Sequence, residues 1–411
     1  MNLEKIPILL VDNHENYQQA CREIQEANEI AIDTEFVGED RYRPDLCLLQ
    51  IATANNIFLI DPIKIKEVNT FWNCLQNPNR VVVGHALREE IRMCTDSTET
   101  IPMHFIDLQI AAGFVGISYP VSYSQLVYHL FRKKLDKSET LTNWRKRPLT
   151  REQIEYAADD VRFLLSSWKL LKKQLTELNR IEWLKEETDQ SIRLAVLEPS
   201  QLEKWRKLAG TQSFEPKRLG ILKAIYEWRE EKAINSNRPM RQILRDQLVV
   251  EIARKNPKQL RDLSSLRGLS RDILDELWLI IQAVMGKNPQ VWPKQQTRNE
   301  YPHYIHILAD LVQIQLNSLS HDLKIASNLI CSISELRNFI YTYAEGLPIR
   351  QESIWNTQWR STHILPKILP FLRGEVALRI ADLKSNSPLS FFPTGNLEAE
   401  KGPEKDSNDT P

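Results

Sequence analysis

The sequence lacks the long apolar segment that a membrane-spanning helix needs. No apolar run in its 411 residues approaches the roughly 20 residues that cross a bilayer, and the densest, residues 277–281, ends at Gln282. We also expect no secretory signal, because residues 6–11 are too short for a signal-peptide core and no small-residue cleavage site follows them. We therefore expect a cytoplasmic protein with no membrane partner.

Cysteines are few, and their spacing suggests no paired role. The five cysteines are odd in number, and no two of them form a Cys-x-x-Cys pair. This pattern argues against a disulfide framework and against a structural zinc site, and it indicates reduced, buried thiols. Net charge is absent as well, with 54 basic and 54 acidic residues, so the total charge identifies no partner.

The composition that is present belongs to a globular protein. Hydrophobic residues make up 42% and charged residues 26% of the chain, which excludes a disordered or collagen-like protein. A chain of this length is too long for one ordinary core, so the sequence predicts two or three domains.

The first part of the chain alternates strand and helix patterns. A capping box formed by Thr150 and Gln153 begins a helix whose apolar residues recur at helical spacing and which runs past Trp168. A polar segment at 12–27 is compatible with a helix. Strands are predicted at residues 30–36, 46–52, 57–60 and 81–85. Strands that alternate with helices predict an α/β domain.

Beyond about residue 195 the sequence predicts helices and no strand. Residues 216–285 are expected to form four or five short helices, residues 286–299 a linker with two prolines, and residues 301–383 further helices. The end of the chain is rich in acidic residues and almost free of apolar ones, which predicts a disordered tail.

Two acidic motifs could carry chemistry. Asp33 and Glu35 lie two residues apart in a predicted strand and share one face, where adjacent carboxylates repel each other unless a hard cation lies between them. Tyr156 and Asp160 lie four residues apart in the capped helix and share a face of it. Neither motif is specific alone, because an edge-strand or salt-bridged pair and a surface hydrogen bond are the common alternatives.

In combination and in this order, the motifs resemble the DEDD family of 3′–5′ exonucleases, in its tyrosine subclass. The resemblance is closer still to ribonuclease D, over about residues 20–170. It is carried by residues 33–37, 49–50, 84–86, 135–138 with Trp144, 147–149 and 155–161. It implies an α/β nuclease domain, a ribonuclease H-like mixed sheet flanked by helices, followed by all-α helical domains.

The resemblance extends into the helical part of the chain. Residues 222–284 are similar to the HRDC domain, which RecQ helicases share with ribonuclease D. Between Glu203 and Lys287 there are 18 basic and 11 acidic residues, a local excess of seven positive charges that suits phosphate contact. The alternative interpretation of this charge excess is an ordinary basic surface that contacts only solvent. The predicted divisions are 1–195 (exonuclease), 211–290 (HRDC-like), 300–385 (second, divergent helical domain) and 395–411 (acidic tail).

The resemblance also implies a site that holds two divalent cations, Mg²⁺ or Mn²⁺. Asp33 is expected to bridge the two ions, and Glu35 and Asp160 to hold the ion on the side of the nucleophile. Glu90 is expected to support the other ion through water. Tyr156 is expected to orient the attacking water, since a phenol is a poor base at neutral pH.

Glu90 departs from the family pattern. The family places an Asp five residues after the His of the second motif, which is His85 here, so the carboxylate of Glu90 lies one methylene further out. We expect a metal-dependent exoribonuclease that acts as a monomer and trims the single-stranded 3′ ends of structured RNA such as tRNA precursors. The alternatives are a catalytically weak RNA-binding member of the same fold and a DNA-directed 3′–5′ exonuclease.

Overall fold

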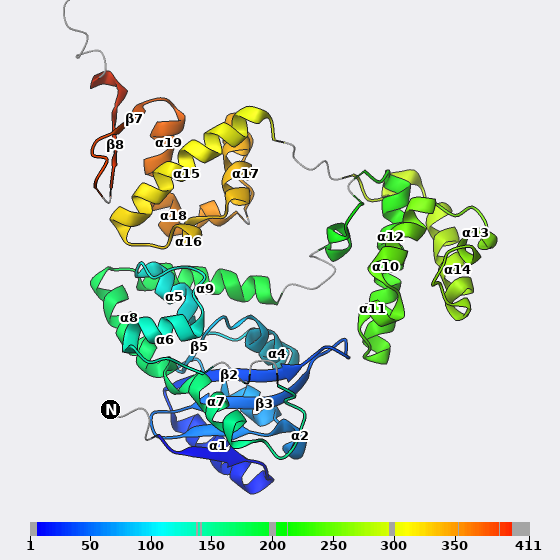
Figure 1. Ribbon diagram of the computed structural model, residues 1–411, viewed down its shortest axis with the longest axis horizontal. Coiled ribbons are helices and arrows are strands. Elements are labelled where there is room, and N and C mark those ends of the chain that lie inside the picture. The colour runs from blue at the N-terminus through cyan, green and yellow to red at the C-terminus, as the bar shows by residue number, and fades with distance from the viewer. Residues whose placement is uncertain are drawn as a thin grey trace, which may run out of the picture.

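A six-stranded mixed sheet lies at the centre of the N-terminal part of the chain (Figure 1). The computed structural model describes residues 6–136, 139, 142–196, 203–211, 213–295, 301–351, 353–385 and 387–396. The strands are β1 (Ile8–Val11), β2 (Glu29–Val37), β3 (Asp45–Ala52), β4 (Ile57–Ile60), β5 (Val81–Gly84) and β6 (Phe105–Asp107). Their order is β1-β4-β3-β2-β5-β6, and β2 runs antiparallel to β3 and parallel to β5.

Helices cover both faces of this sheet (Figure 1). One hydrophobic core joins it to α1 (His14–Glu26), α3 (Asn69–Cys74) and α4 (Arg88–Thr98). The other core joins it to α5 (Leu108–Phe114), α7 (Arg151–Arg162) and α8 (Leu164–Glu177). The remaining helices of this part are α2 (Pro62–Ile65), α6 (Tyr123–Phe131) and α9 (Ile181–Ala195).

Alternation along β2 decides which side chains face which core. Ile30 and Ile32 pack in the core that contains α1 and α3, whereas Ala31 packs in the core that contains α7. The four strands predicted from the sequence are confirmed as β2 to β5. The strands β1 and β6 were not predicted: β6 has three residues, and the short apolar run of β1 does not by itself distinguish a strand from a helix.

The capping box at the start of α7 is present as predicted. The backbone N–H of Gln153 donates to Thr150 Oγ1 (3.1 Å), and the N–H of Thr150 donates to Gln153 Oε1 (3.0 Å). The helix is not continuous past Trp168, however. It ends at Arg162, and α8 begins after Phe163, whose ring packs against Phe131 with 5.6 Å between ring centroids.

Residues 203–295 form a helical unit with a core of its own, set apart from the sheet in Figure 1. Its core is built from residues such as Ile225, Ile252 and Ile281. The elements are η2 (Lys204–Lys207), α10 (Pro216–Ser236), α11 (Met240–Ile243), α12 (Asp246–Lys255), α13 (Leu260–Ser264), η3 (Arg271–Ile273), α14 (Leu274–Met285) and η4 (Pro289–Val291).

Residues 301–396 form a second helical part that ends in a hairpin. Its elements are α15 (His303–Leu323), α16 (Ser327–Ile330), α17 (Ile333–Ala344), η5 (Ile354–Asn356), α18 (Gln358–His363), α19 (Leu365–Leu372), β7 (Val376–Ile380), β8 (Leu389–Pro393) and η6 (Thr394–Asn396). The strands β7 and β8 pair only with each other, antiparallel. The expectation of no strand beyond residue 195 is wrong here, because five-residue apolar runs do not distinguish a strand from a helix by periodicity.

The second helical part shares a hydrophobic core with the sheet-containing N-terminal part. Phe114 of α5 packs edge-on against Trp359 of α18, and Trp183 of α9 stacks on Trp359 with 5.6 Å between ring centroids. The guanidinium of Arg180 donates to the backbone oxygens of Phe114 (2.6 Å), Leu323 and Lys324 (3.0 Å). Residues from both parts therefore form one packed unit.

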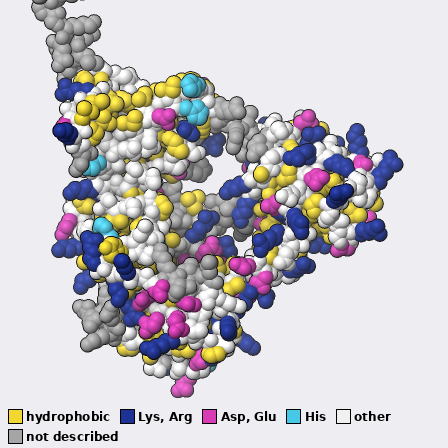
Figure 2. Space-filling view, in the orientation of Figure 1, with side chains coloured by type: hydrophobic (Ala, Val, Ile, Leu, Met, Phe, Trp, Pro, Cys, Tyr) yellow, Lys and Arg dark blue, Asp and Glu magenta, His cyan; other side chains and the backbone are white. Residues whose placement is uncertain are grey.

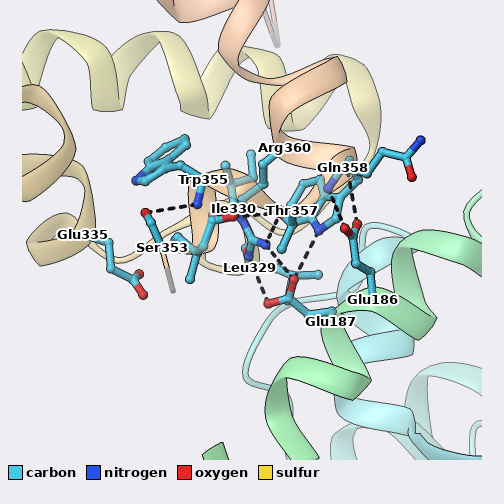
Figure 3. Close-up of polar contacts among 12 residues, drawn as sticks. Glu186, Glu187, Leu329, Ile330, Glu335, Ser353, Trp355, Thr357, Gln358 and Arg360 are labelled. Atoms are coloured by element: carbon cyan, nitrogen blue, oxygen red, sulfur yellow. Dashed lines mark hydrogen bonds and ion pairs between the residues drawn. The ribbon is translucent and has the colours of Figure 1, made fainter. Parts of the chain in front are cut away.

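A buried ion pair lies in the same interface. Arg360 is 2% exposed and donates two hydrogen bonds to the carboxylate of Glu187 on α9, at 2.7 and 3.0 Å. Figure 3 shows this contact together with the bonds from Arg360 to the backbone oxygens of Leu329 and Ile330. The side chain of Glu186 accepts from the backbone N–H of Gln358 beside it.

In the part of the chain that the structure describes, no helix combines the length and apolar character that crossing a membrane requires. The acidic tail predicted for 395–411 lies outside the described residues from residue 397 onward, as do residues 137 and 138 of one motif.

Candidate active site

Asp33 lies at the middle of β2 and Glu35 two residues further on, on the face covered by α7. They occupy alternate positions after Ala31, which packs in the same core as α7. Asp33 lies opposite Gln50 of β3, and its Oδ1 accepts a hydrogen bond from the backbone N–H of Thr34 (2.9 Å). The predicted pair therefore shares one face of the sheet.

Small residues let α7 approach this face closely. Ala157 and Ala158 are both fully buried against the sheet. The helix carries Tyr156 and Asp160 on either side of them. The ring of Tyr156 packs against that of Trp144, with 6.0 Å between ring centroids. The structure thus brings Asp160 to the strand motif, since its charge raises the pKa of Asp33, and places Tyr156 one turn before it on the same helix.

Glu90 reaches β2 from the other flank. It lies in the first turn of α4, is 6% exposed, and accepts a hydrogen bond from Thr34 Oγ1 at 2.5 Å. Its neighbour Glu89 is partly exposed and forms an ion pair with Arg92 (3.6 Å). Of these two adjacent glutamates, Glu90 is the one directed at the site.

The carboxylates form one electrostatic cluster. Burial, then the charges of Asp160 and Glu90, raise the pKa of Asp33 well above its usual value. Burial, then Asp33 and Glu90, raise the pKa of Glu35 to about 8. Burial, then Glu35 and Asp159, raise the pKa of Asp160. Burial also raises the pKa of Glu90, against the effect of the bond from Thr34.

This donor set suits a hard divalent cation. Carboxylate oxygens are the ligands that Mg²⁺ and Mn²⁺ prefer, and a cation would offset the repulsion that raises these pKa values. Among the described residues, no three His, Cys, Asp or Glu side chains converge on one ion as they stand. Glu90 is turned to the Thr34 hydroxyl. The chemistry of the site fits a cation, and its side chains would have to turn to bind one.

Asp107 supports the site and was not predicted from the sequence. Its carboxylate accepts hydrogen bonds from the backbone N–H groups of Ala86 (3.0 Å) and Leu87 (3.2 Å). It thereby holds the turn that leads from β5 into α4, and so the position of Glu90. No spacing motif links Asp107 to this turn, because the contact forms only when β6 pairs with β5.

Tyr123 and His85 are also part of the surroundings of the site. The hydroxyl of Tyr123 donates to the backbone oxygen of Asp159 (3.1 Å), one residue before Asp160. Burial, then the charge of Asp160, raise the pKa of Tyr123. The ring of His85 lies 5.7 Å from that of Tyr123, and its Nε2 is 2.9 Å from the backbone oxygen of Val121. Tyr123 thus joins α6 to α7, and His85 packs against the start of α6.

A cavity of about 370 Å³ opens beside α7. Of the five predicted site residues, Tyr156 lines it. The other lining residues are Asp136, Arg151, Glu152, Glu155 and Asp159. The cavity therefore lies beside the part of α7 that precedes Asp160.

Comparison with known proteins gives two family matches and close full-length relatives. A 3′–5′ exonuclease family matches residues 8–176, and the HRDC domain family matches residues 218–283. Ribonuclease D of Bartonella henselae is 30% identical over 388 residues, which cover 92% of this chain and 93% of that protein. Ribonuclease D of Zymomonas mobilis is 31% identical over 375 residues, covering 88% and 93%.

The fold is also found in a solved structure. The crystal structure of Escherichia coli RNase D, an exoribonuclease involved in structured RNA processing, matches with a TM-score of 0.79. The match covers 89% of this chain and 99% of that one at 23% identity, so it concerns the fold. Because the uncovered share of the chain is shorter than either helical part, the match reaches into both of them.

Proposed function

The chain belongs to the ribonuclease D family of 3′–5′ exoribonucleases, and on that premise we propose that it trims the single-stranded 3′ ends of structured RNA, such as tRNA precursors. The observation that carries this proposal is the carboxylate cluster of Asp33, Glu35, Glu90 and Asp160, which β2, α4 and α7 bring to one place.

Exonucleases of the DEDD family generally use divalent metal ions. In our proposal the four carboxylates hold two of them, Mg²⁺ or Mn²⁺. When bound, such ions make a hydroxide nucleophile available at neutral pH and offset charge on the phosphate. Asp33 suits the bridging role because it lies between the other carboxylates: the charges of Asp160 on α7 and of Glu90 on α4 both raise its pKa. Glu35 and Asp160 suit a shared role because the charge of Glu35 raises the pKa of Asp160.

Tyr156 suits the task of orienting the attacking water. Its ring is held by Trp144, and its place one turn before Asp160 on α7 directs it to the cluster. A hydroxyl can hold a water by hydrogen bonding in either direction, so it orients the water without taking its proton. Tyr123 supports this arrangement, since its bond to the Asp159 backbone oxygen fixes the last part of α7.

The HRDC-like unit would hold the body of the RNA. Figure 2 shows many Lys and Arg side chains over the lobe formed by α10 to α14, in line with the local excess of positive charge. Basic side chains that neutralise phosphates bind nucleic acid of any sequence. An RNA whose body rests on this lobe can present its 3′ end to α7 of the same chain, so one protomer suffices in our proposal.

The proposal is tested by Asp33→Asn, which keeps the shape of the side chain and removes its charge. Purified chains are incubated with 3′-tailed RNA, with and without Mg²⁺ or Mn²⁺, and the products are read at nucleotide resolution. We expect stepwise trimming by the wild type only with the cation, and none by the variant. Since the substitution relieves repulsion, the cation-free variant should unfold no more easily than the wild type. Trimming by Asp33→Asn at the wild-type rate would overturn the proposed site.

The same assay decides between the alternatives. A DNA strand of matched sequence competes for the enzyme, and preferred trimming of the DNA would favour a DNA-directed exonuclease. RNA binding with no trimming under either cation would indicate the catalytically weak alternative. Light scattering of the purified chain checks that it is a monomer.

A further inference from the structure

Gln50 is a buried polar residue without a partner beside the carboxylate cluster. It lies in β3, its side chain is fully buried, and neither Nε2 nor Oε1 has a hydrogen-bond partner in the part of the chain that the structure describes. Burying an amide without hydrogen bonds is unfavourable, and such groups in native proteins have a specific reason. The packing of the core does not supply that reason.

Apolar side chains occupy the equivalent positions along the same strand. Leu48 and Ala52, two residues away on either side, face the same core and are fully or nearly fully buried hydrophobic residues. An apolar residue at position 50 would pack there with no polar group to satisfy. The buried amide of Gln50 is therefore explained if a neighbouring polar side chain changes its orientation and bonds to it when the site is active.

The register of the sheet identifies that partner. Gln50 lies directly opposite Asp33 in the antiparallel pairing of β2 and β3, so the two side chains share a face with Cβ atoms about 4.5–5.5 Å apart. The carboxylate of Asp33 already accepts one backbone N–H, from Thr34, and has further lone pairs. A carboxylate only accepts, so the Nε2–H end of the amide is the end that suits it.

We propose that Gln50 is a positioning residue that donates a hydrogen bond from Nε2 to Asp33 and fixes the orientation in which Asp33 holds a divalent cation. The inference rests on the proposed function. Partners in the outer shell of a metal site orient its ligands, and their loss commonly lowers metal affinity or activity by about 10–100-fold. Asp33 is the carboxylate assigned the bridging role, so its orientation affects both ions.

The test is Gln50→Leu in the full-length chain. Thermal unfolding is measured without cation, Mn²⁺ affinity by calorimetric titration, and trimming under single-turnover conditions. Removal of an unpaired buried amide should leave the midpoint of unfolding unchanged or raise it. We expect Mn²⁺ affinity to fall about tenfold or more and the trimming rate to fall with it. A residue with a purely structural role would not move the affinity.

Thr188→Val is the matched control. Thr188 lies on α9, is 4% exposed, and its Oγ1 also has no partner among the described residues. The substitution likewise removes one unpaired buried polar group, but far along the chain from the carboxylates. Its Mn²⁺ affinity and trimming rate should equal those of the wild type.

The outcomes are distinct. Wild-type Mn²⁺ affinity and rate in Gln50→Leu would overturn the inference and leave the proposed function standing. A wild type that neither binds Mn²⁺ nor trims RNA would overturn both. If Gln50→Leu does not fold, Gln50→Met, with an unbranched side chain of similar length, takes its place, and unchanged affinity there would again overturn the inference.

Discussion

The carboxylate of Glu90 accepts a bond from Thr34, the residue between Asp33 and Glu35. A glutamate at this position can therefore touch the strand that carries Asp33 and Glu35 despite its extra methylene. The bond also shows what must change if Glu90 is to support a cation, because its Oε1 is directed at the Thr34 hydroxyl as the side chain stands. Placement of a ligand matters at such a site, since an error of about 1 Å can cost about 100-fold in rate.

Substitution of Glu90 tests whether it takes the place of the family Asp. Glu90→Gln keeps the size and removes the charge, so we expect the trimming rate to fall about tenfold or more and the metal concentration for half-maximal rate to rise. Glu90→Asp should raise the rate or alter the preference between Mg²⁺ and Mn²⁺. The measurement is single-turnover trimming of one RNA across a metal titration.

Glu89→Gln serves as the control for this series. Its side chain is paired with Arg92 and points about 100° away around α4. Wild-type behaviour of Glu90→Gln across the titration would show that at most three protein carboxylates act at the site.

At the scale of elements, the loop between β2 and β3 is held from two sides. Arg145 donates to the carboxylates of Asp40 (2.6 Å) and Asp45 (2.9 Å) and to the backbone oxygen of Val37 (3.2 Å). On its other side the loop contacts the HRDC-like unit, where the hydroxyl of Tyr42 donates to Glu230 (3.0 Å). The loop directly follows the strand that carries Asp33 and Glu35.

Arg145 also joins this loop to the segment that holds Trp144 against Tyr156. We expect Arg145→Met to lower the trimming rate about tenfold, even on an oligonucleotide too short to reach the HRDC-like unit, because small displacements of catalytic groups are costly. Arg41→Met is the matched control, since Arg41 of the loop pairs with Asp45 at the start of β3 (2.9 Å) and, among the described residues, does not reach the segment of Trp144. Equal rates for the two variants would mean that the loop does not set the position of the site.

Whether an element can be predicted from the sequence depends on the pattern of its own residues and of the residues that flank it. The strands β2 to β5 carry apolar runs whose pattern is visible locally, and the Thr150 capping box is a local signal. By contrast, the five-residue runs of β7 and β8 lie within a part of the chain whose pattern is otherwise helical, and among the described residues they pair with each other alone. The roles of Asp107 and Tyr123 depend on contacts between elements distant in the chain, which no local pattern records.

The carboxylates were predicted because the order of their motifs along the chain resembles that of a known family. Their closeness in space, by contrast, is a property of the fold. Asp33 and Glu90 are far apart in sequence, and the pairing of β2 with β5 brings the start of α4 to the strand that carries Asp33. Likewise, Gln50 is part of a family-like stretch, but its lack of a partner is visible only in the packed sheet.

At the scale of the whole molecule, the nuclease domain and residues 301–372 are one packed unit, and the HRDC-like unit has a separate core. Arg360→Met should therefore destabilise the nuclease unit by about 3–5 kcal/mol, because it leaves Glu187 in a buried interface without its cation. Calorimetry should show this transition at a lower temperature, with the transition of the HRDC-like unit unchanged.

Arg373→Met is the control for that prediction. Arg373 forms an exposed pair with Glu375 in the same part of the chain. Its loss should leave both transitions in place, since exposed ion pairs contribute little to stability. Equal shifts for Arg360→Met and Arg373→Met would contradict a shared core.

We expect that the HRDC-like unit can be removed without loss of the fold or the activity of the nuclease domain. Replacing residues 203–295 with a flexible linker should leave a folded enzyme that degrades short oligonucleotides at the wild-type rate. It should bind long structured RNA less tightly and with a shallower dependence on salt, because fewer phosphates are neutralised. The measurement is the slope of log affinity against log salt concentration, and equal slopes would show that this unit is not the electrostatic platform.

The shared core has a consequence for synthesis on the ribosome. Trp359, which covers Phe114 and Trp183, is translated 164 residues after the end of α9 at residue 195. At a translation rate of roughly 5–20 residues per second, Phe114 and Trp183 remain without their contact to Trp359 for about 10–30 s. Within that interval the HRDC-like unit emerges with all the residues of its own core. The middle of the chain can therefore finish folding before the catalytic domain that precedes it.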